Sequence, residues 1–324
     1  MVCARLRGRR STHRLTPAAI YNYSADAGAG SHIITNISES PGWRGALLGT
    51  VAFGALCLYS ARVARADPDP CTAVGVAPNQ TATCQGNQSQ GITSAGADDF
   101  DPAAVETLNV NSLNTNIAPA AGADGIYFHR TGAGNDVVIN SNTGPFEIVV
   151  SGDGADGIDA QSDAGITIDH IGNIDASQGR YGIFAQVNAP GAGGISVISE
   201  GIVTGSQRGI NARNYGTGAL EIVANGDVTG TNGNGIHGLN FGTNLSIESQ
   251  AVNSGGNAIY ARNHFGALTV TAHGDLIADR IWCLCLQPLG QQRSQRYHSK
   301  HHCKMRWASR QELRERRDNH YRQR

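Results

Sequence analysis

The chain has 324 residues, with 25 basic and 26 acidic residues, 42 glycines and seven cysteines. The charges are unevenly distributed over three segments. Residues 1–66 contain 8 basic and 2 acidic residues, residues 67–279 contain 5 basic and 21 acidic residues, and residues 280–324 contain 12 basic and 3 acidic residues. The middle segment lacks lysine and is rich in Gly, Asn, Ser, Thr, Ala, Ile and Val. This composition argues against a mainly helical domain and favours short strands joined by tight turns.

Residues 44–66 are predicted to be an export signal. An arginine precedes the uncharged run GALLGTVAFGALCLYSA, and Ala64-Arg65-Ala66 follows soon after. A basic flank, an apolar stretch and an A-x-A site predict a Sec-type signal peptide cleaved after Ala66, with an uncleaved membrane anchor as the alternative. Residues 1–43 are then an N-terminal extension, either from a start codon placed upstream of the true one or as part of an unusually long signal.

Residues 67–95 are predicted to form a cysteine-loop cap. Cys71 and Cys84 enclose TAVGVAPNQTAT and are the only cysteines between the signal and residue 279. In an oxidising compartment such a pair can close a small disulfide loop, which would stabilise the fold by about 3 kcal/mol on a loop-entropy model. The alternative is a pair of free thiols.

Residues 96–279 repeat one unit. Its first mark is a small residue followed by isoleucine, with 23 to 32 residues between successive isoleucines: Ile126, Ile158, Ile183, Ile210, Ile236 and Ile259. Its second mark is an alternating apolar run, as in ITID, ISVI, LEIV, LSIE and LTVT, and a third short apolar piece follows a Gly or Asn turn. Three short strands per unit cannot bury an apolar face alone, so the units must stack.

The predicted fold is therefore all-β, a parallel β-helix solenoid of about six or seven coils with disordered or irregular ends. Each strand would pair with its counterpart one coil on, about 4.8 Å away. Asn214, Asn240 and Asn263 fall at one offset after their isoleucines, and they are predicted to form a structural ladder at a turn. A row of ligand-binding amides is the alternative.

Aromatic residues follow these asparagines. Tyr215, Phe241 and Phe265 each precede a glycine, and we expect them to stack in the same corner. A sugar-binding aromatic strip is the alternative interpretation.

Acidic residues gather in SGDGADGIDAQSDAGITID. Asp153, Asp156 and Asp159 are candidate calcium ligands, and paired carboxylates on a β-helix can also carry acid–base catalysis. The default interpretation is that they are turn residues of an acidic rod. Because no G-x-S-x-G, H-E-x-x-H or P-loop motif occurs, we expect no catalytic set, no cofactor and no enzyme activity.

Residues 280–324 form a basic tail of foreign composition. A nucleic-acid or membrane arm and a Cys/His metal site are two interpretations, but the cysteine spacing fits zinc poorly. When plausible codons are chosen for residues 280–290 and read in a shifted frame, they encode Ala-Tyr-Asn-His-Ser-Gly, which is similar to residues 261–266. Residues 296–302 treated in the same way encode an alternating apolar run of the kind found in the strands. The prediction is a frameshift near Asp279, with a disordered tail and no nucleic-acid partner.

The segment from Cys71 to Asp279 resembles the N-terminal part of a bacterial autotransporter passenger, in its signal ending ARADPDP, its cysteine loop and its G-I-x-A repeats. The resemblance implies a right-handed β-helix that is exported through the inner membrane and stands on the cell surface. It also implies an outer-membrane β-barrel translocator as partner in the intact parent. No such barrel segment follows residue 279, so a truncated product would remain periplasmic.

The function expected from this resemblance is adhesion or another interaction with cell surfaces or glycans, without intrinsic catalysis. The alternative is a secreted β-helical carbohydrate-active enzyme of the polysaccharide lyase or hydrolase type. A third interpretation is a small secreted protein with a genuine basic tail.

Overall fold

The structure is a computed structural model that describes residues 68–94, 99–132, 136–188, 191, 193–280 and 283–286, together with the backbone of 297–298. Every regular element in these residues is a β-strand, so they include no helix able to span a membrane. The predicted N-terminal extension (1–43), the predicted signal with Ala64 and Ala66, and most of the predicted tail lie outside the described residues.

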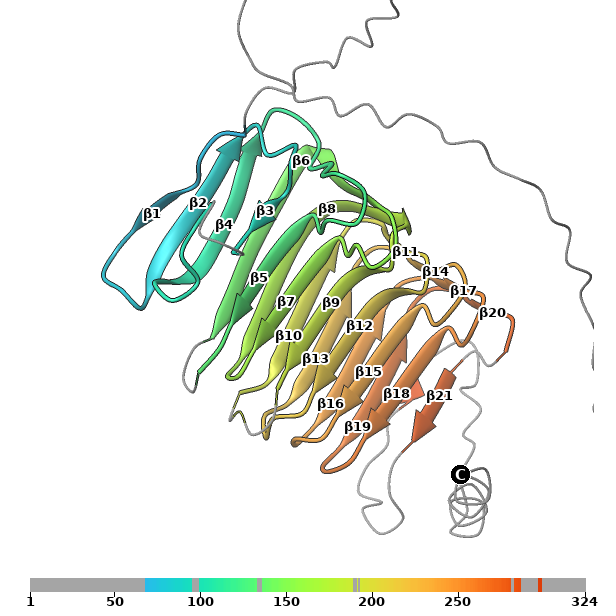
Figure 1. The fold of residues 1–324 in the computed structure, drawn as a ribbon. Coiled ribbons are helices and arrows are strands. Elements are labelled where there is room, and N and C mark those ends of the chain that lie inside the picture. Colours follow the sequence, from blue (N-terminus) through green and yellow to red (C-terminus); the bar gives the residue numbers. More distant parts are fainter. Residues whose placement is uncertain are drawn as a thin grey trace, which may run out of the picture. The chain divides into compact units, whose positions relative to one another are not determined.

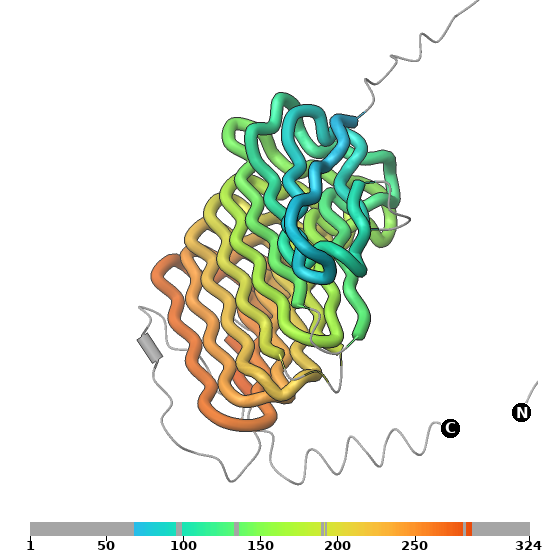
Figure 2. The backbone as a smooth tube through the Cα atoms, turned by 90° about the vertical axis from the view of Figure 1, so that its left-hand side faces the viewer, coloured from blue at the N-terminus to red at the C-terminus, as the bar shows by residue number. Residues whose placement is uncertain are grey.

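The chain winds into successive coils whose strands stack side by side (Figures 1 and 2). One side of every coil belongs to a sheet of eight parallel strands, called here the second sheet. In chain order its strands are β3 (Ile92–Thr93), β5 (Ile126–Arg130), β7 (Ile158–Ser162), β9 (Tyr181–Val187), β12 (Arg208–Asn214), β15 (Ile236–Asn240), β18 (Ile259–Asn263) and β21 (Cys283–Leu286).

The other sides of the coils belong to a sheet of 14 strands, the first sheet. Its main path contains β1 (Thr72–Val74), β2 (Gln80–Gly86), β4 (Val105–Leu113), β6 (Val137–Ser151), β8 (Ile166–Gln178), β10 (Ile195–Glu200), β13 (Leu220–Ala224), β16 (Leu245–Ser249), β19 (Leu268–Ala272) and β22 (Tyr297–His298). A branch that pairs with the C-terminal part of β8 contains β11 (Val203–Gly205), β14 (Val228–Gly230), β17 (Val252–Ser254) and β20 (Leu276–Ala278).

The core consists of three columns of apolar side chains, one from each repeat mark. The isoleucines from Ile126 to Ile259 pair in register along the second sheet. A second column runs from Val137 to Leu268 along the first sheet, and a third runs from Ile148 to Leu276 along its branch. Nearly all of these side chains are fully buried, so stacking removes from water the apolar face that a single unit would expose.

The predicted parallel β-helix is confirmed, but the second sheet has eight strands, so the stack has eight coils rather than six or seven. The additional strands lie at the two ends. Ile92 pairs with Ile126 and starts the isoleucine column within the expected cap. Cys283 pairs with Ile259 and extends the same column into the basic segment. Cys283 is buried at this position, as the column isoleucines are.

Glycine precedes the column isoleucines because this position faces the core at a corner of the coil. A Cβ atom on Gly182 would lie 2.5 Å from a methyl group of Val203, and one on Gly235 would lie 2.2 Å from a methyl group of Val252. The same clash occurs, at 2.2 to 2.3 Å, for Gly125, Gly157 and Gly209. The corner therefore requires glycine wherever the facing core residue is branched at Cβ. Among these isoleucines, only Ile259 is preceded by alanine, Ala258. The third-column residue of its coil is Leu276, which is unbranched at Cβ.

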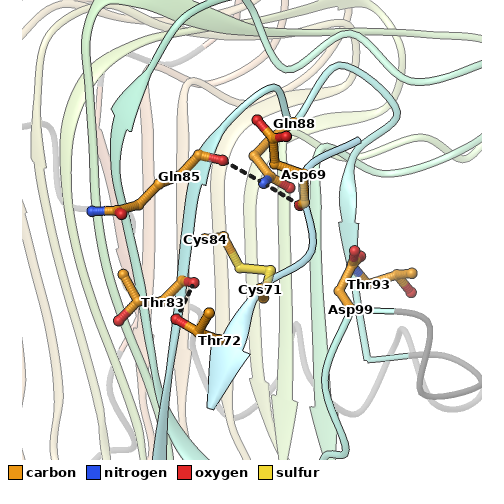
Figure 3. The surroundings of a disulfide bond; sticks show 9 residues. All are labelled: Asp69, Cys71, Thr72, Thr83, Cys84, Gln85, Gln88, Thr93 and Asp99. Carbon is orange, nitrogen blue, oxygen red and sulfur yellow. Dashed lines mark hydrogen bonds between the residues drawn. A yellow bond between two sulfur atoms is a disulfide. The ribbon is translucent and has the colours of Figure 1, made fainter. Parts of the chain in front are cut away.

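A disulfide joins Cys71 to Cys84 at the N-terminal end of the stack (Figure 3). It ties β1 to β2, which pair antiparallel over three residues. Next to it, the side-chain amide of the fully buried Gln88 donates to the carbonyl oxygens of Asp69 and Gln85, each at 2.8 Å. The short antiparallel strand covers the edge of the first sheet, which protects the stack against pairing with other chains.

Two glycine substitutions in one coil, three residues apart, test the corner constraint. Gly235→Ala should lower the free energy of unfolding by about 1 to 3 kcal/mol, because the new methyl group overpacks the core against Val252. Gly238→Ala is the matched control, because its Cβ would meet only flexible side-chain ends at 3.0 Å or more and its ladder neighbours Ala212 and Ala261 are alanines. Urea unfolding of both variants should show Gly238→Ala unchanged or up to about 1 kcal/mol more stable. Equal destabilisation would contradict the corner argument.

Candidate functional site

The outer face of the second sheet gathers polar and aromatic side chains in columns. Strand alternation directs the residue after each column isoleucine outward. The register aligns these residues from coil to coil as Tyr127, Asp159, Phe184, Asn211, His237 and Tyr260. A second outward column, two residues on, contains His129, Gln161, Gln186, Arg213, Leu239 and Arg262. The second column is at least partly exposed in every one of these coils, whereas Asp159, Phe184 and Asn211 of the first column are buried.

Three carboxylates meet near the N-terminal end of this face. The ligand oxygens of Asp124, Asp156 and Asp159 lie within 4.8 Å of one another. Asp124 and Asp156 each precede a corner glycine, and the backbone N–H of Asp156 donates to Asp124 Oδ1 at 2.7 Å. The structure thus brings two of the three candidate calcium ligands together with Asp124, whereas Asp153 lies exposed in a turn outside the cluster.

Arg180 neutralises the most buried of the three carboxylates. Its Nε donates to Asp156 Oδ1 at 2.9 Å, and its Nη2 contacts Asp156 Oδ2. The backbone N–H of Tyr181 also donates to Asp156 Oδ1 at 3.0 Å. Burial raises the pKa of Asp156 to about 6, although the hydrogen bonds from Arg180 oppose the shift. The guanidinium group already supplies the positive charge that a calcium ion would bring to this carboxylate.

Asp124 and Asp159 are the carboxylates that Arg180 does not bind directly. Burial, together with the charge of Asp159, raises the pKa of Asp124 to about 6. His129 Nε2 lies 2.9 Å from Asp159 Oδ1, and the side-chain amide of Gln161 donates to the same oxygen at 3.2 Å. The His129 ring packs against Tyr127 with ring centroids 3.8 Å apart. This end of the face therefore combines hydrogen-bond acceptors with an aromatic surface.

Further along the stack, arginines pack on aromatic rings. The guanidinium carbon of Arg180 lies 4.6 Å from the ring centroid of Tyr181, and that of Arg208 lies 5.4 Å from the same ring. Arg208 Nη1 also donates to the Tyr181 hydroxyl at 3.1 Å. Arg213 lies 5.8 Å from the Phe184 ring. These cation–π contacts orient the guanidinium groups on the outer face.

The C-terminal part of the face includes buried polar groups that lack partners. His237 stacks on Tyr260 with centroids 4.9 Å apart, and burial lowers the pKa of His237 to about 3. Within the described part of the chain, neither His237 Nδ1 nor the amide nitrogen of the fully buried Asn211 has a hydrogen-bond partner. Asn211 pairs in register with His237, so these two unpartnered groups lie in adjacent coils.

The three asparagines of the predicted ladder hydrogen-bond to one another in a row. Asn214 Nδ2 donates to Asn240 Oδ1, and Asn240 Nδ2 donates to Asn263 Oδ1, both at 2.9 Å. Each is fully buried and bonds nearby backbone groups as well, such as the N–H of Gly216. These side-chain amides are buried and hydrogen-bond to one another and to turn backbone groups, so they are not available to a ligand.

The aromatic stack beside this ladder differs from the expected one in its third member. Tyr215 stacks on Phe241 at 5.4 Å, and Phe241 stacks on His264 at 3.8 Å. Phe265 is exposed and lies 6.5 Å from His264. The prediction of Phe265 was wrong because the stacking position directly follows the asparagine, and in this coil that residue is histidine.

Sequence reasoning missed Asp124 and Arg180. The signal for Asp124 was the tetrad Ala-Asp-Gly-Ile, which occurs at 123–126 and again at 155–158. Arg180 has no equivalent signal, because it stands at the end of a turn before β9 and no other coil has a matching arginine.

Comparison of the chain with protein-family models, with curated proteins and with solved structures gave no match.

The acidic cluster predicts a pH-dependent stability. Because the pKa of Asp124 in the folded state, about 6, exceeds its ordinary value of 3.8, the folded state binds more protons between these values and stability falls as pH rises through this window. Asp124→Asn keeps an oxygen acceptor for Asp156 N–H and removes the charge. Its thermal unfolding midpoint should exceed that of the unaltered chain by about 2 to 4 °C at pH 7.5, and the difference should vanish near pH 4.

Asp153→Asn is the control for this measurement, because Asp153 is exposed and outside the cluster. A stabilisation by Asp124→Asn that is independent of pH, or one matched by Asp153→Asn, would show that burial of the Asp124 carboxylate is not its cause.

Proposed function

We propose that this chain is an exported passenger segment of an autotransporter-like cell-surface protein, and that it acts by binding rather than by catalysis. The observation that carries the proposal is the continuous outer face of the second sheet. There, polar and aromatic side chains repeat in register over successive coils. A repeated flat face of this kind suits an extended ligand that is contacted at many points.

Two further features support export and surface display. A disulfide such as Cys71–Cys84 persists in oxidising compartments and is rare in the cytosol. The segment 67–279 has 21 acidic residues against 5 basic ones, which favours solubility outside the cell. The G-I-x-A repeats and the cysteine loop resemble autotransporter passengers, and the parallel β-helix is compatible with that family.

Adhesion of cells to a surface coated with the purified chain tests this proposal. Gln186→Ala combined with Tyr260→Ala, both on the outer face of the second sheet, should reduce cell retention at least about fivefold, because they remove contacts in two coils. The matched control is Thr167→Ala with Thr269→Ala on the outer face of the first sheet, which should retain cells normally. Equal retention by both double variants, or no retention by the unaltered chain, would contradict the proposal.

A second candidate function is that of a carbohydrate-active enzyme, favoured by one observation. Asp124, with a pKa of about 6, lies close to Asp159, and a carboxyl group that holds a proton beside a carboxylate is the arrangement used in glycoside hydrolysis. Against it, the third carboxylate is occupied by Arg180, and the outer columns beyond β9 contain no further carboxylate.

Release of reducing ends or unsaturated sugars from a panel of polysaccharides separates the two functions. We expect none from the unaltered chain. Depolymerisation that disappears in Asp124→Asn and Asp159→Asn but persists in Asp153→Asn would establish the enzyme and overturn the binding-only proposal.

A further inference from the structure

Basic residues are segregated onto one face of the β-helix. Residues 67–279 contain five arginines and no lysine. Four of them, Arg180, Arg208, Arg213 and Arg262, lie in or directly before strands of the second sheet. The fifth, Arg130, is buried, and its guanidinium group donates to three backbone carbonyl oxygens, those of Pro78, Pro102 and Asp136.

Acidic residues are distributed in the opposite way. Strands β9, β12, β15 and β18 contain no Asp or Glu. In the same coils, Glu221 and Glu248 lie exposed on the outer face of the first sheet. The domain is acidic, yet carboxylates are absent from these four strands. The arginines in these strands are therefore not neutralised by neighbouring acidic residues. The region bounded by β9 and β18 is called here the arginine face.

Three arginines of this face have no carboxylate partner among the described residues, where ion pairs are found only at His129–Asp159, Arg180–Asp156 and His273–Glu248. Arg208 bonds the neutral hydroxyl of Tyr181, and Arg213 Nε donates to Asn211 Oδ1 at 3.3 Å. Arg208 is half-buried, and burial and the neighbouring charge of Arg213 lower the pKa of its guanidinium group. A partly desolvated cation without a counter-charge is stabilised when an anion binds.

The neutral groups between the arginines match a sugar chain. Tyr260 is half-buried and offers a ring face on which a pyranose ring can stack. Tyr181 and Phe184 are buried, with arginine guanidinium groups over their rings. The half-buried amide of Gln186, which lies in the same outer column as Arg213, can hydrogen-bond sugar hydroxyls. Successive coils repeat every ~4.8 Å, a spacing comparable to the length of one sugar residue in an extended chain.

We propose that the arginine face binds an acidic polysaccharide, lying along the coil axis, with carboxylate or sulfate groups bound by Arg208, Arg213 and Arg262 and hydroxyl groups bound by Gln186. This inference rests on the proposed binding function and names its ligand class. Arg213 and Arg262 occupy the same outer column two coils apart, with Leu239 between them. Their spacing of about 10 Å fits a polymer with one anionic group on every second sugar.

A nucleic acid fits this face less well. Each nucleotide carries a phosphate, so nucleic-acid grooves need a dense row of cations. Here the cations are sparse, and Asp124, Asp156 and Asp159 bound the face at one end. A ligand that mixes anionic groups with hydroxyls matches both features.

Binding of the full-length chain to hyaluronan, which has one carboxylate in each disaccharide, tests the proposal by calorimetry. Arg213→Gln combined with Arg262→Gln should weaken binding at least about tenfold, because two charge-assisted hydrogen-bonding groups are lost. Raising the salt concentration should also weaken binding of the unaltered chain. Glu221→Gln with Glu248→Gln, on the outer face of the first sheet, is the matched control and should bind within about twofold of the unaltered chain.

Three results would overturn the inference: unchanged hyaluronan binding in the arginine double variant, equally tight binding of neutral dextran, or tighter binding of single-stranded DNA. Failure here can be separated from failure of the proposed function. If hyaluronan does not bind but cell retention still depends on Gln186 and Tyr260, the ligand class is wrong and the binding function stands. If neither occurs, both proposals fail.

Discussion

The structure depends on parallel pairing of each strand with its counterpart one coil on. That pairing aligns identical positions of successive repeats, so the isoleucines from Ile126 to Ile259 form one buried column. The corners of the coil are tight enough that glycine must precede these isoleucines wherever a β-branched side chain faces it. The asparagines from Asn214 to Asn263 follow the same register, and their side chains hydrogen-bond to one another and to backbone groups of the following turn. Register is thus fixed by apolar packing, by sterics and by hydrogen bonds at once.

Because register fixes the inward side chains, the outward ones are free to vary while still lying in straight columns. Because equivalent outward residues of successive coils lie one strand spacing apart, together they form a surface. On the second sheet this surface has an acidic end, where Arg180 neutralises Asp156, and an arginine face that continues to β18. The first sheet carries exposed glutamates in the same coils. One fold therefore presents faces of different charge on different sides of each coil.

Most of the fold could be predicted from the sequence, because residues that contact one another in successive coils recur as similar residue types at a regular spacing. The three apolar marks, the asparagine offset and the cysteine pair could each be read from spacing. The coils at the ends were missed for a physical reason: Cys283 occupies an isoleucine position without a preceding glycine, and Gly91-Ile92 stands far from the next mark. The site was harder to predict. Arg180 pairs with Asp156 of the preceding coil, a contact that no repeat encodes. The segregation of arginines is visible only once strands are assigned to faces.

A crystal structure of the chain with a hyaluronan oligosaccharide would show whether the arginine face binds an acidic sugar chain. We expect a sugar chain lying parallel to the coil axis over β9 to β18, with carboxylates within hydrogen-bonding distance of Arg213 and Arg262 and a ring stacked on Tyr260. An oligosaccharide bound on the first sheet, or one on the second sheet whose carboxylates do not contact these arginines, would contradict it.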